Sequence, residues 1–109
     1  MTTLAPHRDT VDQFVASMHA GADKDALSDI LAEDVVLYGP LDDEPLTGRQ
    51  AVLEAIQTVS AAAADLTYRE VLSGTTHHAA YFRLQIDDTV VNGMDRIRFD
   101  ANGKIAEVT

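Results

Sequence analysis

The sequence contains no cysteine and no tryptophan, and basic residues are scarce. Without cysteine the chain can form neither a disulfide nor a thiolate metal site, which suits a reducing compartment such as the cytoplasm. Lys and Arg number 8 against 18 Asp and Glu, which gives a formal net charge of -10. A surface of this charge repels phosphate groups, so we expect neither nucleic acid nor an anionic membrane as a partner.

Long apolar stretches are missing as well. Residues 1–10 lack the apolar centre of a signal peptide, and no later stretch has the length of a membrane span. The chain has 109 residues, of which 46% are hydrophobic, and this suits one domain with one modest core. We therefore expect a single cytoplasmic domain over residues 1–109.

Three helices are expected in the first half of the chain. The first has apolar residues at helical spacing over residues 11–18, begins near residues 9–10 and ends near Gly21. A shorter helix should end at residues 33–34, before a strand at residues 35–38 that Gly39-Pro40 stops. After an acidic loop at residues 41–46, the capping-box spacing of residues 47–50 should open the third helix. The residues expected on the buried sides of the last two helices are Leu27, Ile30, Leu31, Val52, Ile56 and Val59.

In the second half the apolar period changes from about 3.6 residues to about 2, which indicates strands. The pattern predicts strands at residues 66–73, 77–86, 89–99 and 105–108, joined by turns at residues 74, 87–88 and 100–103. Helices followed by a run of antiparallel strands are typical of an α+β domain with its helices on one face of the sheet.

The two-residue turn at residues 87–88 sets a register that pairs Ile86 with Thr89 and Ala80 with Asp95. In this register Asp95 lies on the apolar face, where a carboxylate needs a partner or a purpose. The apolar face carries His78, Phe82, Leu84, Ile86, Val91, Asp95 and Phe99. The opposite face carries His77, Tyr81, Arg83, Gln85, Asn92, Arg96 and Arg98.

Several short motifs follow one another along the chain. They are Phe14-Val15, Gly21, Leu31-Ala32-Glu33-Asp34-Val35, Gly39-Pro40, Thr47-Gly48-Arg49, Asp95-Arg96-Ile97-Arg98-Phe99 and Gly103-Lys104-Ile105. This series resembles the nuclear transport factor 2-like superfamily, which includes the SnoaL-like cyclases and the ketosteroid isomerases. The resemblance implies a cone-shaped α+β fold, with three helices packed on a curved, mostly antiparallel sheet around an apolar pocket.

The resemblance to the ketosteroid isomerases fails at two of their three catalytic positions. Phe14 stands where these enzymes carry a tyrosine, and Gly39 stands where they carry the aspartate base. The second aspartate is kept as Asp95. Because no base remains at the usual position, we do not expect a standard ketosteroid isomerase.

Asp95 is expected at the floor of the pocket, diagonal to His78 on the neighbouring strand. A His–carboxylate pair there could exchange protons with a ligand; alternatively, Asp95 only ties down His78 or a backbone amide. Desolvation should raise the pKa of Asp95 and a charged His78 should lower it, and without His78 the carboxyl should be protonated near neutral pH. Tyr38 could donate a hydrogen bond at the pocket mouth or serve only as a rim aromatic. The expected lining is Phe14, Met18, Phe82, Leu84, Ile97, Phe99 and Val108.

Two classes of function fit this pocket. One is a cofactor-independent isomerase, cyclase, dehydratase or hydrolase that acts on an apolar carbonyl, polyketide-like or epoxide substrate. The other is a non-catalytic module that binds an apolar small molecule or forms a dimer. We expect no metal site, because the adjacent His77 and His78 would point to opposite faces of their strand.

The outer sheet face indicates self-association. Its apolar residues Tyr81, Val90 and Met94 lie among arginines, and aromatic, Met and Arg side chains are the types enriched at interfaces. Together with the resemblance, this predicts a two-fold homodimer through that face.

Overall fold

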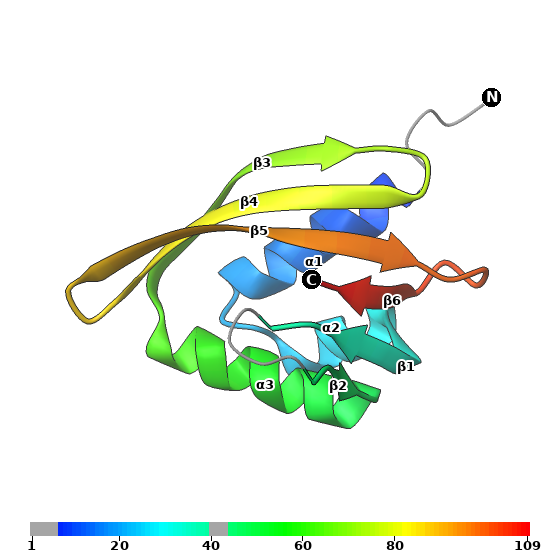
Figure 1. The fold of residues 1–109 in the computed structure, drawn as a ribbon, viewed down its shortest axis with the longest axis horizontal. Coiled ribbons are helices and arrows are strands. Elements are labelled where there is room, and N and C mark those ends of the chain that lie inside the picture. The colour runs from blue at the N-terminus through cyan, green and yellow to red at the C-terminus, as the bar shows by residue number, and fades with distance from the viewer. Residues whose placement is uncertain (1–6, 40–43) are drawn as a thin grey trace.

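The computed structural model describes residues 7–39 and 44–109. Most of the expected N-terminal tail, Pro40 and the first part of the acidic loop lie outside these ranges. Three helices pack on one side of a curved sheet (Figure 1). This is the expected α+β arrangement, and none of the described helices has the length and apolar character needed to cross a membrane.

The helices are α1 (Arg8–His19), α2 (Lys24–Ile30) and α3 (Arg49–Ala62). Helix α1 begins earlier than expected, because His7 adopts a left-handed conformation with φ 68° and its carbonyl accepts the first helical N–H groups. Helix α2 is capped by Asp23, whose carboxylate accepts two backbone N–H groups of the first turn. It ends at Ile30, so residues 33–34 belong to the following strand rather than to the helix end.

Two expectations for α3 are wrong. Gly48 precedes the helix with φ 104° and no side chain caps the helix, so the capping box does not form. The buried residues of α3 are Val52, Leu53 and Ile56. Val59, expected beside them, lies in the last turn of the helix and is 53% exposed.

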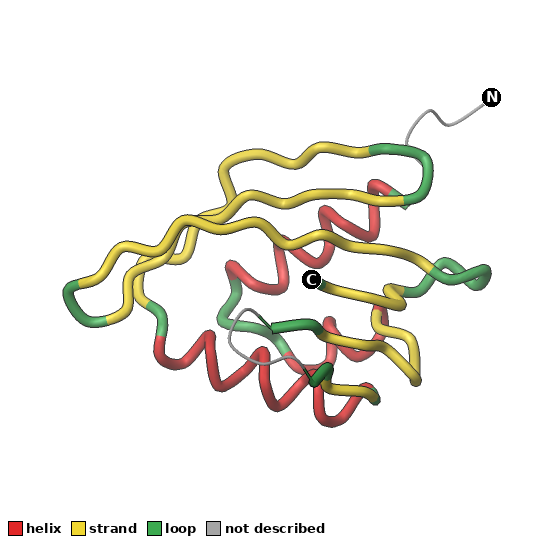
Figure 2. Tube along the Cα trace, in the orientation of Figure 1, coloured by secondary structure: helices red, strands yellow, loops and turns green. Residues whose placement is uncertain are grey.

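The sheet has six strands in the order β2-β1-β6-β5-β4-β3 (Figure 2). The short β2 was not expected, and it pairs antiparallel with β1. The C-terminal β6 lies between β1 and β5, parallel to the former and antiparallel to the latter. The strands are β1 (Leu31–Leu37), β2 (Leu46–Thr47), β3 (Ala64–Ser73), β4 (His77–Ile86), β5 (Thr89–Phe99) and β6 (Ile105–Val108).

The register expected for the β4–β5 hairpin is confirmed. Ile86 pairs with Thr89 and Ala80 with Asp95, and every residue between them follows the same register. Asp87 has φ 52°, a left-handed conformation that Asp tolerates and that a tight two-residue turn needs. The side of the sheet that meets the helices is called the inner face here, and Asp95 lies on it.

The core lies between the helices and the inner face. Its fully buried large side chains come from α1, α2, α3 and from strands β1, β5 and β6, so one core connects both halves of the chain. They are Leu27, Leu31, Ile97, Ile105, Val11, Val35 and Val52. This packing fixes the inner face on which the polar residues described below are placed.

Candidate functional site

A tyrosine and an aspartate meet on the inner face. The Tyr68 hydroxyl of β3 donates a hydrogen bond of 2.8 Å to Asp95 Oδ2 of β5. Strand β4 lies between these two strands, so the phenol crosses a whole strand to reach the carboxylate. Both side chains are half-buried. The partner that a carboxylate on the apolar face requires is therefore Tyr68.

The phenol of Tyr68 can cross β4 because a small residue lies below its path. Tyr68 pairs with Phe82, whereas Asp95 pairs with Ala80, one inner-face position further along. The side chain of Ala80 is a buried methyl group, which leaves room for the phenol to pass diagonally over the strand. A hydrogen bond between strands that are not neighbours thus depends on a small residue between them.

Aromatic rings surround the phenol. The ring of Tyr68 lies edge-on to Phe14 of α1 with centroids 6.2 Å apart, and it lies 5.9 Å from the ring of Phe82. Edge-on and tilted arrangements of this kind are the favourable ones for aromatic pairs. Phe14 has no hydroxyl group, but its ring packs against Tyr68, whose hydroxyl binds Asp95.

The surroundings change the acidity of both groups. Burial raises the pKa of Asp95 from its ordinary value of 3.8 to about 6, although the hydrogen bond from Tyr68 acts in the opposite direction. Burial, together with the adjacent Asp95 carboxylate, also raises the pKa of Tyr68, which stays a neutral donor. At pH 7 a carboxyl with this pKa is protonated only about a tenth of the time. Asp95 is thus mainly a carboxylate, because Tyr68 offsets part of the desolvation that the sequence indicated.

His78 pairs with Ile97, so on the neighbouring strand it lies diagonal to Asp95 as expected. Its side chain is 2% exposed, and its Nδ1 forms a 2.9 Å hydrogen bond with Ser73 Oγ on β3. The ring lies edge-on to Phe99, with centroids 5.4 Å apart. Tyr68 is the residue whose hydrogen bond acts on the pKa of Asp95. A proton-exchanging pair of His78 and Asp95 stays a prediction.

The other expected site residues divide into exposed and buried ones. Tyr38 follows the end of β1 and is exposed, and its backbone N–H donates to the Val108 carbonyl at 2.9 Å. Phe82 and Phe99 are partly buried on the inner face. Five of the expected lining residues are buried: Phe14, Met18, Leu84, Ile97 and Val108.

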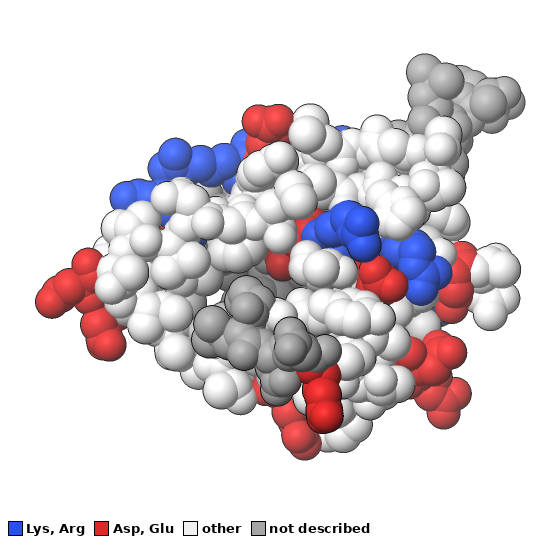
Figure 3. All heavy atoms as spheres, viewed as in Figure 1, with Lys and Arg blue, Asp and Glu red and all other residues white. Residues whose placement is uncertain are grey.

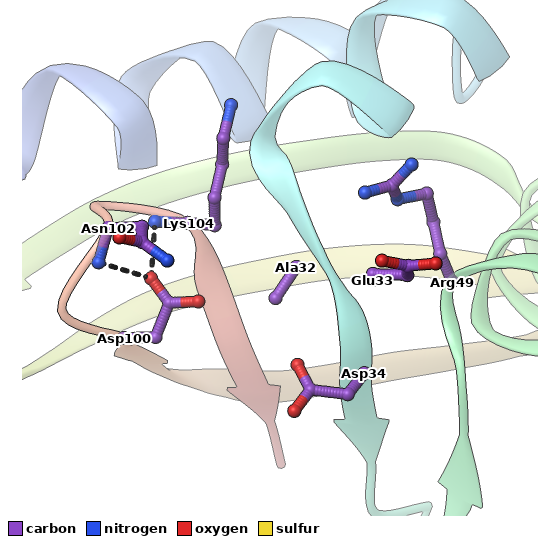
Figure 4. Close-up of a pocket in the computed structure, with 7 residues that line it drawn as sticks. All are labelled: Ala32, Glu33, Asp34, Arg49, Asp100, Asn102 and Lys104. Atoms are coloured by element: carbon purple, nitrogen blue, oxygen red, sulfur yellow. Dashed lines mark hydrogen bonds between the residues drawn. The ribbon is translucent and has the colours of Figure 1, made fainter.

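Asp95 lines neither of two hollows in the described part of the surface, whose volumes are about 540 and 570 Å³. The first, of about 540 Å³, lies between β1, the start of α3 and the β5–β6 turn (Figure 4). Its lining carries charges of both signs from Glu33, Asp34, Arg49, Asp100 and Lys104. Lys104 Nζ turns away to donate to the Asp29 carbonyl at 2.6 Å, and the Asp100 carboxylate is occupied by backbone N–H groups of its own turn. The side chains that line this hollow are therefore mostly charged, and the apolar pocket expected beside Asp95 stays a prediction.

The second hollow, of about 570 Å³, lies over β3, β4 and β5, where Tyr81 and Met94 of the outer face border it. Phe82 is the one expected lining residue that contributes to it. Within the described part of the chain, no group of three or more His, Asp or Glu side chains could hold a metal ion.

The sequence placed Asp95 on the inner face, but it did not indicate Tyr68 as the partner of that carboxylate. The register of β3 against β4 shifts on both sides of Thr67 and Tyr68, so it could not be extrapolated from a turn, as the β4–β5 register was. A weaker signal was available, because Leu66 and Tyr68 alternate at strand spacing. A tyrosine on an apolar face needs a partner for its hydroxyl, and the Asp95 carboxylate needed a donor.

Comparison with known proteins agrees with the fold. Residues 11–108 match the family model described as a SnoaL-like domain. No curated protein matches the sequence.

Solved structures with the same fold have varied descriptions. A steroid delta-isomerase from Pseudomonas aeruginosa is 23% identical and superposes with a TM-score of 0.85, over 94% of this chain and 75% of that one. An NTF2-like protein of unknown function from Burkholderia xenovorans is 19% identical, with a TM-score of 0.81 over 94% of this chain and 79% of that one. A de novo designed protein with a curved β-sheet is also 19% identical, with a TM-score of 0.78 and coverages of 94% and 80%. At these identities the likeness concerns the fold alone.

Proposed function

Because the chain belongs to the SnoaL-like domain family and carries a Tyr68–Asp95 pair on its inner face, we propose that it binds an apolar small molecule and transfers a proton at Asp95. The observation that carries the proposal is the 2.8 Å hydrogen bond between the two side chains, at a carboxyl whose pKa is about 6. A base with a pKa near the working pH is well suited to catalysis.

The chemistry follows from the protonation states of the pair. At neutral pH the Asp95 carboxylate can take a proton from an acidic C–H or O–H group of a ligand, while Tyr68 stays neutral and donates to the carboxylate. The rings of Phe14, Phe82 and Tyr68 offer apolar contact and little solvation. The ligand class that fits is therefore an apolar molecule with a carbonyl or a similar group that acidifies a neighbouring C–H bond.

Proton transfer can be tested without knowledge of the natural substrate. In D2O, 2-tetralone, an apolar ketone with acidic C–H groups, should exchange hydrogen for deuterium faster with the protein than in buffer alone, as followed by NMR. The rate should rise with pH through about 6, as Asp95 ionises. Asp95→Asn should reduce the rate roughly 100-fold or more, the usual contribution of a general base. Exchange that is unaffected by Asp95→Asn would refute the role of Asp95.

The second candidate is a module of the same family that binds an apolar ligand without changing it. The hydrogen bond from Tyr68 favours this alternative, because it gives the Asp95 carboxylate the partner it needs without any proton transfer. Saturable binding of 2-tetralone without exchange above the buffer rate would support binding alone. Tyr68→Phe is a matched variant for both measurements, binding and exchange, because it removes the hydroxyl of Tyr68 and keeps the ring.

A further inference from the structure

A second side chain of α1 contacts the residue that carries the phenol. His19, the last residue of α1, accepts the backbone N–H of Tyr68 at its Nε2 atom with a distance of 3.0 Å. The rings of His19 and Tyr68 lie 5.7 Å apart in a tilted arrangement. Helix α1 therefore meets Tyr68 twice, with Phe14 at the ring and His19 at the main chain.

The hydrogen bond lies where the sheet itself holds Tyr68 weakly. Strand β3 is at the edge of the sheet, so N–H groups on its open side have no neighbouring strand to bind. The β3–β4 register shifts between Ala64 and Thr67 and again between Tyr68 and Glu70. The two residues between these shifts have an irregular ladder on either side, so an additional attachment of the main chain fixes the position of Tyr68.

A backbone amide can only donate, so Nε2 of His19 must carry a lone pair in this contact. The ring is then the neutral tautomer with its proton on Nδ1. A series of contacts leads from His19 through the main chain of Tyr68 and its phenol to the carboxylate of Asp95. His19 is exposed, so this role does not depend on its being part of the core.

We propose that His19 is a positioning residue, which holds the Tyr68 main chain so that the phenol reaches Asp95 across β4. This inference rests on the proposed function of the pair, because it assigns His19 no contact with a ligand. Its consequence is that loss of the His19 acceptor weakens the hydrogen bond between Tyr68 and Asp95.

The test measures the pKa of the Asp95 carboxyl by carbon-13 NMR in four proteins. Tyr68→Phe removes a hydrogen bond to a carboxylate and should raise this pKa by about one unit. His19→Ala should raise it in the same direction by a smaller amount. His19→Gln, whose amide oxygen can accept near the position of Nε2, should return the pKa toward that of the unmodified protein. A merely structural role of His19 would lower stability in both variants and leave the pKa unchanged.

The contact can also be observed without any substitution. The unmodified protein should show a scalar coupling across the hydrogen bond between the nitrogen of Tyr68 and Nε2 of His19. Absence of this coupling, or an unchanged pKa in His19→Ala when Tyr68→Phe does raise it, would overturn the role of His19 alone. If Tyr68→Phe leaves the pKa of Asp95 unchanged, the pair itself and the proposed function fail as well.

Discussion

At the scale of the residue, Asp95 ties stability to pH. Its pKa is 3.8 in the unfolded chain and about 6 in the folded protein, so the folded state binds the proton more tightly. The stabilising effect of protonation is complete below pH 4 and is lost as the pH rises through 6. A shift of about two units corresponds to about 3 kcal/mol.

Asp95→Asn should therefore lose less unfolding free energy than the unmodified protein as the pH rises. Between pH 4 and pH 7.5 the difference between the two proteins should change in favour of the variant by up to about 3 kcal/mol. The reason is that the variant has no charge to desolvate. Urea unfolding of both proteins at the two pH values measures the difference. A difference in unfolding free energy that is the same at both pH values would contradict this assignment.

Phe14 and Gly39 lead to a negative prediction. The resemblance places them where ketosteroid isomerases carry a tyrosine and the aspartate base, and Asp95 alone cannot both hold the steroid oxygen and move the proton. The protein should therefore not convert a 5-ene-3-ketosteroid faster than background, as followed by the absorbance of the conjugated product. Phe14→Tyr combined with Gly39→Asp is the variant in which weak activity could emerge. Ready turnover by the unmodified protein would show that the residue matching is wrong.

At the scale of the element, Gly93 of β5 leaves room for the Phe82 ring of β4, which in turn lies beside Tyr68 of β3. Gly93 pairs with Phe82, which pairs with Tyr68, and the ring of Phe82 leans over the glycine. A methyl group at Gly93 would lie 2.9 Å from Cε2 of that ring and would collide with its Cζ.

Gly93→Ala should therefore lower the unfolding free energy by about 1–3 kcal/mol, because Phe82 must move against Tyr68. Gly39→Ala is the matched control, since a methyl group there meets no atom of the described residues within 4 Å. Urea unfolding compares the two variants. An equal effect of both substitutions would show that the Phe82 ring adjusts freely.

The elements also show which parts of the structure the sequence could predict. The β4–β5 register follows from a two-residue turn and a clean alternation, so Asp95 was placed on the correct face. The position of Tyr68 depends on register shifts in β3, which no local pattern records. The place of β6 beside β1 depends on pairing between distant segments, such as Leu31 with Ile105. The sequence therefore predicted the pairing of strands joined by a short turn, but it did not predict the pairing of segments that are distant in the chain.

At the scale of the whole molecule, the outer sheet face remains open. Tyr81, Val90 and Met94 are 42–44% exposed there. In Figure 3 the basic side chains lie over the sheet, while the α3 side of the molecule carries acidic ones in that view. We expect this face to form a two-fold dimer, with aromatic, Met and Arg side chains at its centre.

Light scattering at micromolar concentrations should give the mass of a dimer. Met94→Arg should give a monomer, because the two-fold axis would bring added positive charges together with those of Arg83 and Arg96. Val59→Arg, an equally drastic change at an exposed position of α3, should leave the dimer intact. A monomer mass for the unmodified protein would count against the interface.

The central place of β6 has a consequence for the order of folding. Its four residues join β2 and β1 to the β5-β4-β3 part of the sheet. Strands β3 to β5 can pair through short turns, whereas β1 and β6 must first close the long loop between them, which is slow. Stopped-flow refolding should therefore be slowed by Ile105→Ala, whereas Leu53→Ala should mainly speed unfolding. Until β6 is in place, β5 presents an open edge, so the interval before loop closure is the period in which the chain is most exposed to aggregation.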